Sequence, residues 1–283
     1  MENSLKLYRI IMEFVWQSGI RFHDLRTLNV FVWSIIGLLM SHQVHLSQWL
    51  LYRTGSAKAA SKQRQLSRWL HNPKIDPLTI YRPLIQKALL EFAGQTLYLA
   101  LDSSRLWNRF TIVRLALIYR GRALPLTWIV QASQTAKVTF TDYQPLLVSV
   151  AAWLPSSCRV ILLADRGFGD RRLFRQTRKL GWHFRIRLKS AFWVYRKGKA
   201  PSKIGRLMPA KGEALFLHRV RITKHRYGPV YLALAHVQTP EGYEQWAIVS
   251  DEPTHLTTFD EYGLRFDIEI VCTQMTKTRV FTI

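Results

Sequence analysis

Two carboxylates in the chain follow apolar runs and could bind metal ions. Asp102 ends the run LYLALD, and Asp165 ends the run VILLAD. Both runs predict core strands, where a charged side chain needs a particular reason to be present because such side chains are seldom buried. If the two strands are neighbours, both carboxylates face one cleft. Carboxylate oxygens are the ligands that hard divalent cations prefer.

A third carboxylate lies in a helical pattern near the end of the chain. Tyr262, Arg265 and Glu269 are spaced i, i+3 and i+7, which predicts one face of a helix. Glu269 would complete a site for two Mg²⁺ ions roughly 3.5–4 Å apart, the arrangement that stabilises attacking and leaving oxygens in phosphodiester chemistry. Arg265 would offer a planar fork to a phosphate and Tyr262 a hydroxyl, so both are predicted DNA-positioning residues.

The elements that would position these carboxylates begin at residue 95. TLYLALD, FTIVRLALIYR and ALPLTWIVQ predict three consecutive antiparallel strands. A helix (DYQPLLVSVAAWL), a strand (CRVILLAD), a basic helix (RRLFRQTRKL) and a strand (HFRIRLK) follow. The order β-β-β-α-β-α-β predicts an α/β (α+β) fold, a ribonuclease H-like mixed sheet flanked by helices. Its first and fourth strands are adjacent, and sites form at the carboxyl ends of buried strands.

The whole chain is predicted to divide into four segments. Residues 1–95 have helical spacing and form a helical DNA-binding or dimerisation domain. Residues 96–190 are the first part of the catalytic core, and 191–250, with ALFLHRVRI, PVYLALAHV and EQWAIVSD, form an inserted β-rich module. Residues 251–283 carry the helix with Glu269 and leave the core incomplete.

The charge of the chain indicates its partner. Lys and Arg total 41 against 18 Asp and Glu, a formal charge of +23. Nucleic acid is the polyanion that such a protein most commonly meets, although charge alone leaves ribosomal, membrane-surface and nuclease functions open. The most apolar run, 28–40, is shorter than the ~20 residues of a membrane span and predicts a buried helix. Two cysteines without a CxxC pair, and no secretory signal, favour a reducing cytoplasm.

Further DNA contacts are predicted in two places. Lys58, Lys62, Arg64 and Arg68 lie around a helix that ends near Asn72-Pro73, and a solvated basic helix face is the alternative. Trp193, Tyr195 and Trp246 in the β-rich module are candidates for stacking on an unpaired base, with core packing as the alternative for each.

Three blocks resemble the catalytic blocks of insertion-sequence DDE transposases, in the insertion-sequence-four-like subgroup. They are ALDSSRLWNRF, LLADRGFGD and the Tyr-x2-Arg-x3-Glu pattern. The resemblance covers roughly residues 95 to 270, and the subgroup has a β-rich insertion between its second aspartate and its glutamate. It implies that Asp102, Asp165 and Glu269 are catalytic residues and metal ligands.

The resemblance also implies an activity and partners. The activity is cut-and-paste DNA transposition and recombination, in which the enzyme cleaves at the terminal inverted repeats of a mobile element and the freed 3′-hydroxyl is the nucleophile. It requires two Mg²⁺ ions, for which Mn²⁺ can substitute. The implied state is a homodimer in a paired-end complex on double-stranded DNA, in the bacterial nucleoid and away from membranes. The rival functions are a ribonuclease H-like nuclease or Holliday-junction enzyme, and a catalytically impaired remnant that only binds DNA.

The last residues depart from the family pattern. The Glu-x6-Lys pattern expects lysine at position 276, where this chain has Thr276, and Lys277, a predicted DNA contact, comes one place late. Codons for residues 275–278, read one nucleotide earlier, can encode Asp-Asp-Lys-Asn, an acidic pair followed by a lysine. We therefore expect the chain to be shortened and out of frame just after Glu269.

Overall fold

The computed structural model describes residues 2–107, 109–132, 138–239 and 242–270, with side chains from residue 3 to 268. The chain divides into two compact units, Met1–Glu91 and Phe92–Ile283. The sequence places the corresponding boundary at residue 95, just before the first strand. Each unit has its own core.

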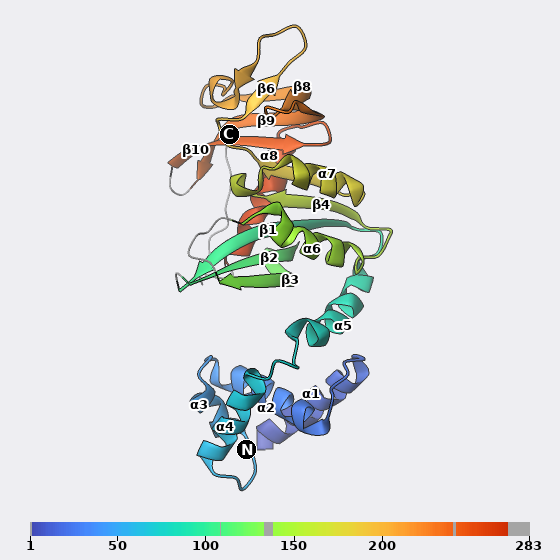
Figure 1. Ribbon diagram of the computed structural model, residues 1–283, viewed down its shortest axis with the longest axis vertical. Helices are drawn as coiled ribbons and strands as arrows, with labels where there is room; N and C mark the ends of the chain where they lie inside the picture. The colour runs from blue at the N-terminus through green and yellow to red at the C-terminus, as the bar shows by residue number, and fades with distance from the viewer. Residues whose placement is uncertain (1, 108, 133–137, 240–241, 271–283) are drawn as a thin grey trace. The chain divides into compact units, whose positions relative to one another are not determined.

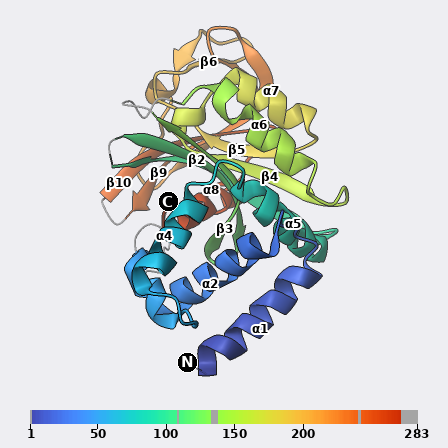
Figure 2. The same cartoon turned by 60° about the horizontal axis from the view of Figure 1, so that its bottom comes forward.

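The first unit is helical. Its elements are α1 (Glu2–Gln17), α2 (Leu25–Ser41), α3 (Leu46–Trp49), η1 (Leu50–Tyr52), α4 (Ala59–Leu70) and α5 (Pro77–Leu89), followed by η2 (Leu90–Phe92). Asp24 begins α2 by accepting a hydrogen bond from the backbone N–H of Thr27 (2.6 Å), the usual role of an aspartate N-cap. α1 and α2 run side by side (Figure 2), and the rings of Tyr8 and Trp33 meet at 5.1 Å between them.

The apolar run at residues 28–40 lies in α2 and contributes most of the core of this unit, as predicted; the buried members include Leu28, Val32, Trp33 and Ile36. Among the described residues, no single helix is long and apolar enough to cross a membrane. One pair of helices, Leu25–Ser41 with Leu46–Tyr52, meets that test by length and composition, and it is bent by 99°.

The second unit contains one ten-stranded mixed sheet. Its strands are β1 (Thr96–Leu106), β2 (Phe110–Tyr119), β3 (Arg122–Ala132), β4 (Arg159–Ala164), β5 (His183–Arg187), β6 (Trp193–Tyr195), β7 (Ser202–Lys203), β8 (Ala214–Ile222), β9 (Tyr227–Thr239) and β10 (Gly242–Ser250). β1, β2 and β3 are antiparallel neighbours, whereas β4 lies parallel to both β1 and β5. The resulting order, β3-β2-β1-β4-β5, is the predicted ribonuclease H-like arrangement.

The β-rich segment 191–250 is not a separate body, because its strands continue the same sheet. β10 pairs antiparallel with β5, opposing Ile248 to Arg187, and β9, β8, β6 and β7 follow in that order. An inserted module was expected from the turn residues between its strands. Sequence periodicity identifies strands, but it does not show which existing edge they extend.

Helices cover both faces of the sheet (Figure 1). On one face are α6 (Phe140–Ala151) and α7 (Arg171–Lys179), and on the other are α8 (Thr257–Gly263), η5 (Leu264–Phe266) and α9 (Asp267–Ile270). Two consecutive β5 residues demonstrate these layers, since Phe184 stacks on Phe174 of α7 and Arg185 bonds Glu261 of α8. Alternating strand side chains point to opposite faces. Two short 3-10 turns, η3 (Arg166–Phe168) and η4 (Ile204–Arg206), complete the unit.

Candidate active site at the carboxyl ends of β1 and β4

The two predicted aspartates follow the last paired residues of β1 and β4. The parallel pairing of these strands ends with Leu101 opposite Ala164, and Asp102 and Asp165 are the next residue on each strand. Neighbouring strands lie about 4.8 Å apart, so the backbones of the two aspartates are close at one edge of the sheet. The sequence predicts these neighbouring strands correctly, but it places the end of the first strand at Asp102, whereas β1 continues to Leu106 in its pairing with β2.

Asp102 is held by three side chains. Its Oδ2 accepts hydrogen bonds from Arg114 (3.1 Å) and Ser104 (3.3 Å), and its Oδ1 lies 3.8 Å from a terminal nitrogen of Arg265. The aspartate side chain is 13% exposed. A carboxylate in this setting has a fixed orientation and retains access to solvent at the edge of the sheet.

Arg114 is a site residue that the sequence analysis missed. It lies on β2 directly opposite Asp102 on β1. The signal was present in the apolar strand FTIVRLALIY, which contains one charged residue, Arg114. Pairing the two predicted strands of the hairpin would have placed it against Asp102, because facing residues of an antiparallel pair share one side of the sheet.

Asp165 begins the turn η3, and one of its carboxylate oxygens accepts a hydrogen bond within that turn. Its Oδ1 accepts a hydrogen bond from the backbone N–H of Gly167 at 2.8 Å. A Cβ atom at position 167 would lie 3.0 Å from that same oxygen, so the tight turn favours glycine there. Among the described residues, none donates a hydrogen bond to Oδ2 of Asp165. That oxygen is therefore available to a ligand.

The segment that carries Tyr262 and Arg265 packs against this edge. The sequence predicts one continuous helix, whereas the structure has α8, a 3-10 turn and α9 in succession. The backbone remains right-handed throughout, with φ −56° and ψ −24° at Leu264. Arg265 is 6% exposed, and its guanidinium lies 4.5 Å from the ring centroid of Phe266 and 5.9 Å from that of Tyr262. These rings hold the guanidinium beside Asp102.

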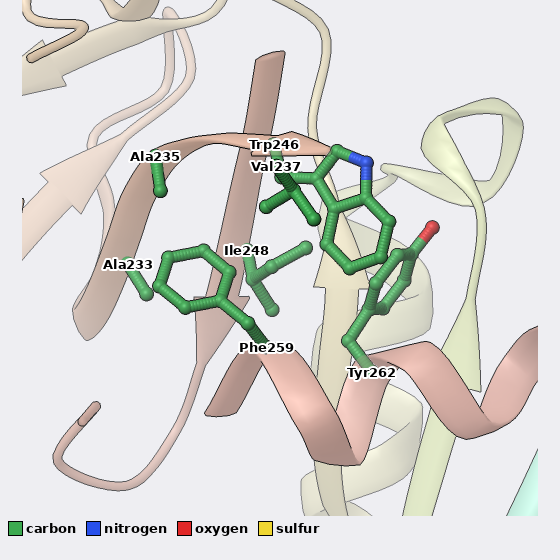
Figure 3. Packing of buried hydrophobic residues seen from close by; sticks show 7 residues of the cluster. All are labelled: Ala233, Ala235, Val237, Trp246, Ile248, Phe259 and Tyr262. Atoms are coloured by element: carbon green, nitrogen blue, oxygen red, sulfur yellow. The ribbon is translucent and has the colours of Figure 1, made fainter. Parts of the chain in front are cut away.

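Tyr262 supports the site from within the core. Burial raises the pKa of its hydroxyl; the positive charges of Arg265 and Arg187 oppose this rise, and the negative charge of Asp165 adds to it. The hydroxyl points away from the apolar side chains around the ring (Figure 3). The predicted direct DNA contact by Tyr262 is therefore wrong for this conformation, because its side chain is 0% exposed.

Trp246 also belongs to the core, so its predicted stacking on DNA is wrong. It is 0% exposed and meets the ring of Tyr262 edge-on at 5.0 Å and stacks on Phe266 at 5.7 Å. Trp246 belongs to β10, and Figure 3 shows its ring beside that of Tyr262, in a cluster with Ala233, Ala235, Val237, Ile248, Phe259 and Tyr262. Trp246 acts on the site indirectly, by supporting the two rings that hold Arg265.

Trp193 and Tyr195 remain accessible. Both are half-buried on β6, with Lys203 5.8 Å above the ring of Trp193 and Arg226 5.0 Å above that of Tyr195. Trp193 lines a hollow of about 660 Å³ that begins at the turn following Asp165. Other residues around this hollow are Gly167, Arg171, Lys189, Lys203 and Lys224. It combines an aromatic face with several cations.

In the first unit, the four basic residues predicted to contact DNA at α4 differ in their exposure and in their hydrogen-bond partners. Lys58, Arg64 and Arg68 are exposed, and Arg64 and Arg68 line a shallow hollow of about 360 Å³ with Ser61 and Ser67. The ammonium of Lys62 instead donates to the backbone carbonyls of Arg53 (2.9 Å) and Gly55 (2.8 Å). Lys62 therefore fastens the loop before α4, which makes it a weaker candidate for DNA contact than the prediction assumed.

Two predicted site residues cannot be placed by their side chains. The backbone of Glu269 lies in α9, and its preceding neighbour Ile268 packs on Ala100 and Ala116, on the same sheet face as Asp102. The side chain of Glu269 is outside the described part of the chain, as is Lys277. The proposed shift of reading frame also concerns residues outside the described ranges and stays a prediction.

A buried arginine fixes α8 to the sheet. Arg185, 4% exposed, donates to Glu261 of α8 (2.7 Å), Glu252 (2.9 Å) and the Ser250 hydroxyl (3.0 Å). Burial opposes the charge of Arg185, but its two glutamate partners outweigh that effect and raise its pKa. Since α8 leads into Tyr262 and Arg265, this network positions the candidate site from a distance.

His183, Asp251 and Glu252 form a second cluster with metal-ligand chemistry, with donor atoms within 4.8 Å of one another. It lies at the start of β5 and just beyond the end of β10, whereas Asp102 and Asp165 each follow the last residue through which β1 and β4 pair with each other. Glu252 already binds Arg159 through both oxygens at 2.8 Å, in addition to Arg185. These ion pairs satisfy the carboxylate, so we assign the cluster a structural role.

No protein-family model matches the chain, and no curated protein does either. Among solved structures, the chain is similar to one in a cryo-EM structure of the piggyBac transposase synaptic complex with hairpin DNA, at 10% identity, 89% coverage of this chain and a TM-score of 0.47. It spans 59% of that chain. A second similar structure is Argonaute of Marinitoga piezophila with 5′ OH guide RNA and target DNA, at 12% identity and a TM-score of 0.27, covering 71% of this chain and 31% of that one. Because both TM-scores are low, the assignment of the fold depends on the strand order described above and not on these two structures.

Proposed function

We propose that this chain is a DDE transposase, which cleaves DNA at the terminal inverted repeats of a mobile element and joins the freed 3′ end to target DNA. The single observation that carries the proposal is the adjacency of Asp102 and Asp165, which directly follow the parallel pairing of β1 with β4, with Arg265 beside Asp102. Buried strands of this type place their functional groups at their carboxyl ends. The blocks in which these residues occur support the choice of transposase over other enzymes of the fold.

The donor set suits divalent metal. Asp165 has an oxygen to which no described residue donates, and Asp102 is oriented at the same edge, so the two carboxylates would hold Mg²⁺ or Mn²⁺. Glu269, on the helical segment that packs over this face, is the proposed third ligand. When bound, two such ions stabilise negative charge on the attacking and leaving oxygens of a phosphodiester.

The protein's own residues would orient the reacting groups. Arg114 and Arg265 approach the Asp102 carboxylate from two sides, which fixes its direction and offsets its charge. Arg265 is also the group best placed to meet a phosphate of the bound strand, since a guanidinium offers several donors in one plane. Preorganised charges of this kind lower a barrier because they need not rearrange during the reaction.

The DNA would contact both units. The formal charge of +23 supplies the attraction, and the exposed Lys58, Arg64 and Arg68 of α4 are proposed to bind the backbone near the repeats. The hollow beside Asp165, with Trp193 and its surrounding cations, would receive an unpaired base near the cut. Two copies, one on each end, are the proposed assembly.

For the test, the DNA on both sides of the gene is searched for inverted repeats. Duplexes that contain these repeats are then incubated with the purified chain. We expect Mg²⁺-dependent cleavage at the repeat ends, and joining of a 3′-hydroxyl end to plasmid DNA. Asp102→Asn and Asp165→Asn should abolish both reactions while metal-free DNA binding is retained. Asp260→Asn, an exposed carboxylate on α8, serves as the matched control.

Each alternative gives a different result in the same assay. Cleavage without joining would indicate a nuclease, and tight binding without any cleavage would indicate a DNA-binding remnant. Retained cleavage in either aspartate variant would reject the assigned metal ligands.

A further inference from the structure

The turn between β1 and β2 presents an exposed tryptophan. Trp107 is 78% exposed, and among the described residues no ring contact or hydrogen bond involves its side chain. A single exposed apolar side chain is common on a protein surface, so the exposure of Trp107 by itself does not indicate a partner. No other part of the proposed site uses it.

The backbone of this turn makes the choice of tryptophan more unusual. Trp107 has φ +52°, in the left-handed region that glycine adopts without steric cost. At the other end of β2, the turn into β3 uses Gly121 in that region, with φ +70°. A tryptophan at position 107 therefore adds strain without adding a packing contact. Such strain is more readily understood at a functional position than at a structural one.

The turn lies on the same strand as the catalytic candidate. β4 ends at Ala164, opposite Leu101, while β1 continues to Leu106 in its pairing with β2 (Figure 1). Trp107 is five residues beyond Asp102, which corresponds to about 17 Å along an extended strand. DNA bases are spaced by about 3.4 Å, so this reach corresponds to about five base pairs from the metal site.

The charges around Trp107 identify the partner. Arg105 and Arg109 are both exposed on either side of it, and the guanidinium of Arg109 lies 5.7 Å from the ring centroid of Phe110. An aromatic ring between two cations suits a phosphate backbone whose bases can be reached by stacking.

We propose that Trp107 is a wedge that stacks on a base of the bound duplex, about five base pairs from the scissile phosphate, and bends the DNA there. The proposal rests on the proposed transposase function. Arg105 and Arg109 bind the flanking phosphates, and the ring partly unstacks the base step between them. Wedges of this type favour deformable steps, because less stacking is lost when such a step opens.

The test compares two 40-base-pair duplexes of mixed sequence, one fully paired and one with a central pair of T·T mismatches flanked by 2-aminopurine. Binding is measured without metal, so that no strand is cut. The wild-type chain should bind the mismatched duplex about tenfold more tightly, because the cost of unstacking has already been met, and 2-aminopurine fluorescence should change on binding. Trp107→Ala should lose this preference, and Trp107→Phe should keep part of it.

Trp16→Ala is the matched control, since Trp16 is 72% exposed on α1 of the other unit. It should preserve the preference and the fluorescence change. Equal preference in Trp107→Ala and the wild type would overturn the wedge. A change in oligomeric state of Trp107→Ala by light scattering, with DNA binding unaltered, would assign the ring to a protein contact instead. Failure of the wild-type chain to bind either duplex would contradict the proposed function itself.

Discussion

The guanidinium of Arg265 lies 3.8 Å from the carboxylate of Asp102, although the two residues come from different layers of the fold. Arg265 lies in η5 and Asp102 in β1, and the contact joins the helical segment to the edge of the sheet. Two aromatic rings hold the guanidinium in this position. The predictions below begin from this contact and proceed to the elements that maintain it.

Replacing Arg265 should impair cleavage more than DNA binding. We expect Arg265→Lys to lower the single-turnover cleavage rate about 100-fold. An ammonium group lacks the coplanar N–H donors of a guanidinium, and it places the positive charge at a different distance from Asp102. Arg265→Met should lower it further. Arg159→Gln, which removes an exposed arginine at the opposite end of the strands, is the control and should cleave normally. A wild-type rate in Arg265→Met would remove Arg265 from the mechanism.

The two tryptophans of the β-rich segment should respond in opposite ways. Trp246→Ala should reduce the free energy of unfolding by about 3–5 kcal/mol, the usual cost of emptying a large buried site, because its ring is fully enclosed. Trp193→Ala should unfold close to the wild type but bind DNA more weakly. Urea unfolding and DNA titration of both variants provide the measurement. Equal stabilities would contradict the core position of Trp246.

Removing the buried arginine should destabilise the second unit. Arg185→Met leaves Glu261 and Glu252 without their main partner, and we expect a loss of about 3–5 kcal/mol in the free energy of unfolding. Arg159 also pairs with Glu252, but it is 46% exposed, and its loss should cost less than about 1 kcal/mol. Chemical denaturation that ranks the two variants in the reverse order would show that α8 is anchored elsewhere.

The same network should contribute to acid sensitivity. Burial tends to raise the pKa of Glu252, but Arg185, His183 and Arg159 outweigh it and hold that pKa below 4.5. The folded state therefore binds a proton less readily than the unfolded state. The contribution is fully present above pH 4.5 and is lost as pH falls through the lowered pKa. In the Glu252→Gln variant, the unfolding temperature should therefore depend less on pH below pH 4.5 than it does in the wild type. The same pH dependence in both proteins would contradict this role of Glu252.

The dependence of DNA binding on salt should distinguish the basic residues of α4. Each lost phosphate contact should reduce the slope of log K against log salt by about 0.9. We expect Arg64→Gln with Arg68→Gln to reduce it by about 1.8, since both side chains are exposed. Lys62→Gln should leave the slope unchanged, because its ammonium binds two carbonyls of the protein. A flat titration of the wild-type chain would contradict phosphate-based binding altogether.

The strands β1 to β5 and their order were accessible from the sequence, because each has a mostly apolar pattern, whereas the continuation of the sheet by β10, β9, β8, β6 and β7 was not. The positions of Asp102 and Asp165 followed from that order alone. Tyr262 and Trp246 could not be assigned correctly in the same way. Tyr262 was expected to offer its hydroxyl to DNA, and Trp246 was a candidate for base stacking with core packing as the alternative; aromatic side chains with a polar group serve cores and binding surfaces alike. Which of the two occurs depends on the packing of α8 against β10.

The roles of Lys62 and Arg185 could not be predicted from the sequence either. A basic residue in a helix or strand pattern looks like a surface charge until its partners are known. For Lys62 the partners are backbone carbonyls, which no side-chain pattern records. For Arg185 they are glutamates 67 and 76 residues later in the chain. Arg114 differs, since its partner lies across a hairpin that the sequence does predict.

The antiparallel pairing of β10 with β5 constrains how this protein can diversify. Residues 191–250 lie between the segment that contains Asp165 and the segment that contains Tyr262 and Arg265. In this segment, β10 supplies the part of the sheet against which Tyr262 packs, through Trp246 and Ile248. A chimera that replaces the whole segment would leave the edge of β5 bare and remove the support of the Arg265 contact. Exchange should therefore be tolerated only for β6, β7 and the outer turns, while β9 and β10 must be inherited together with α8.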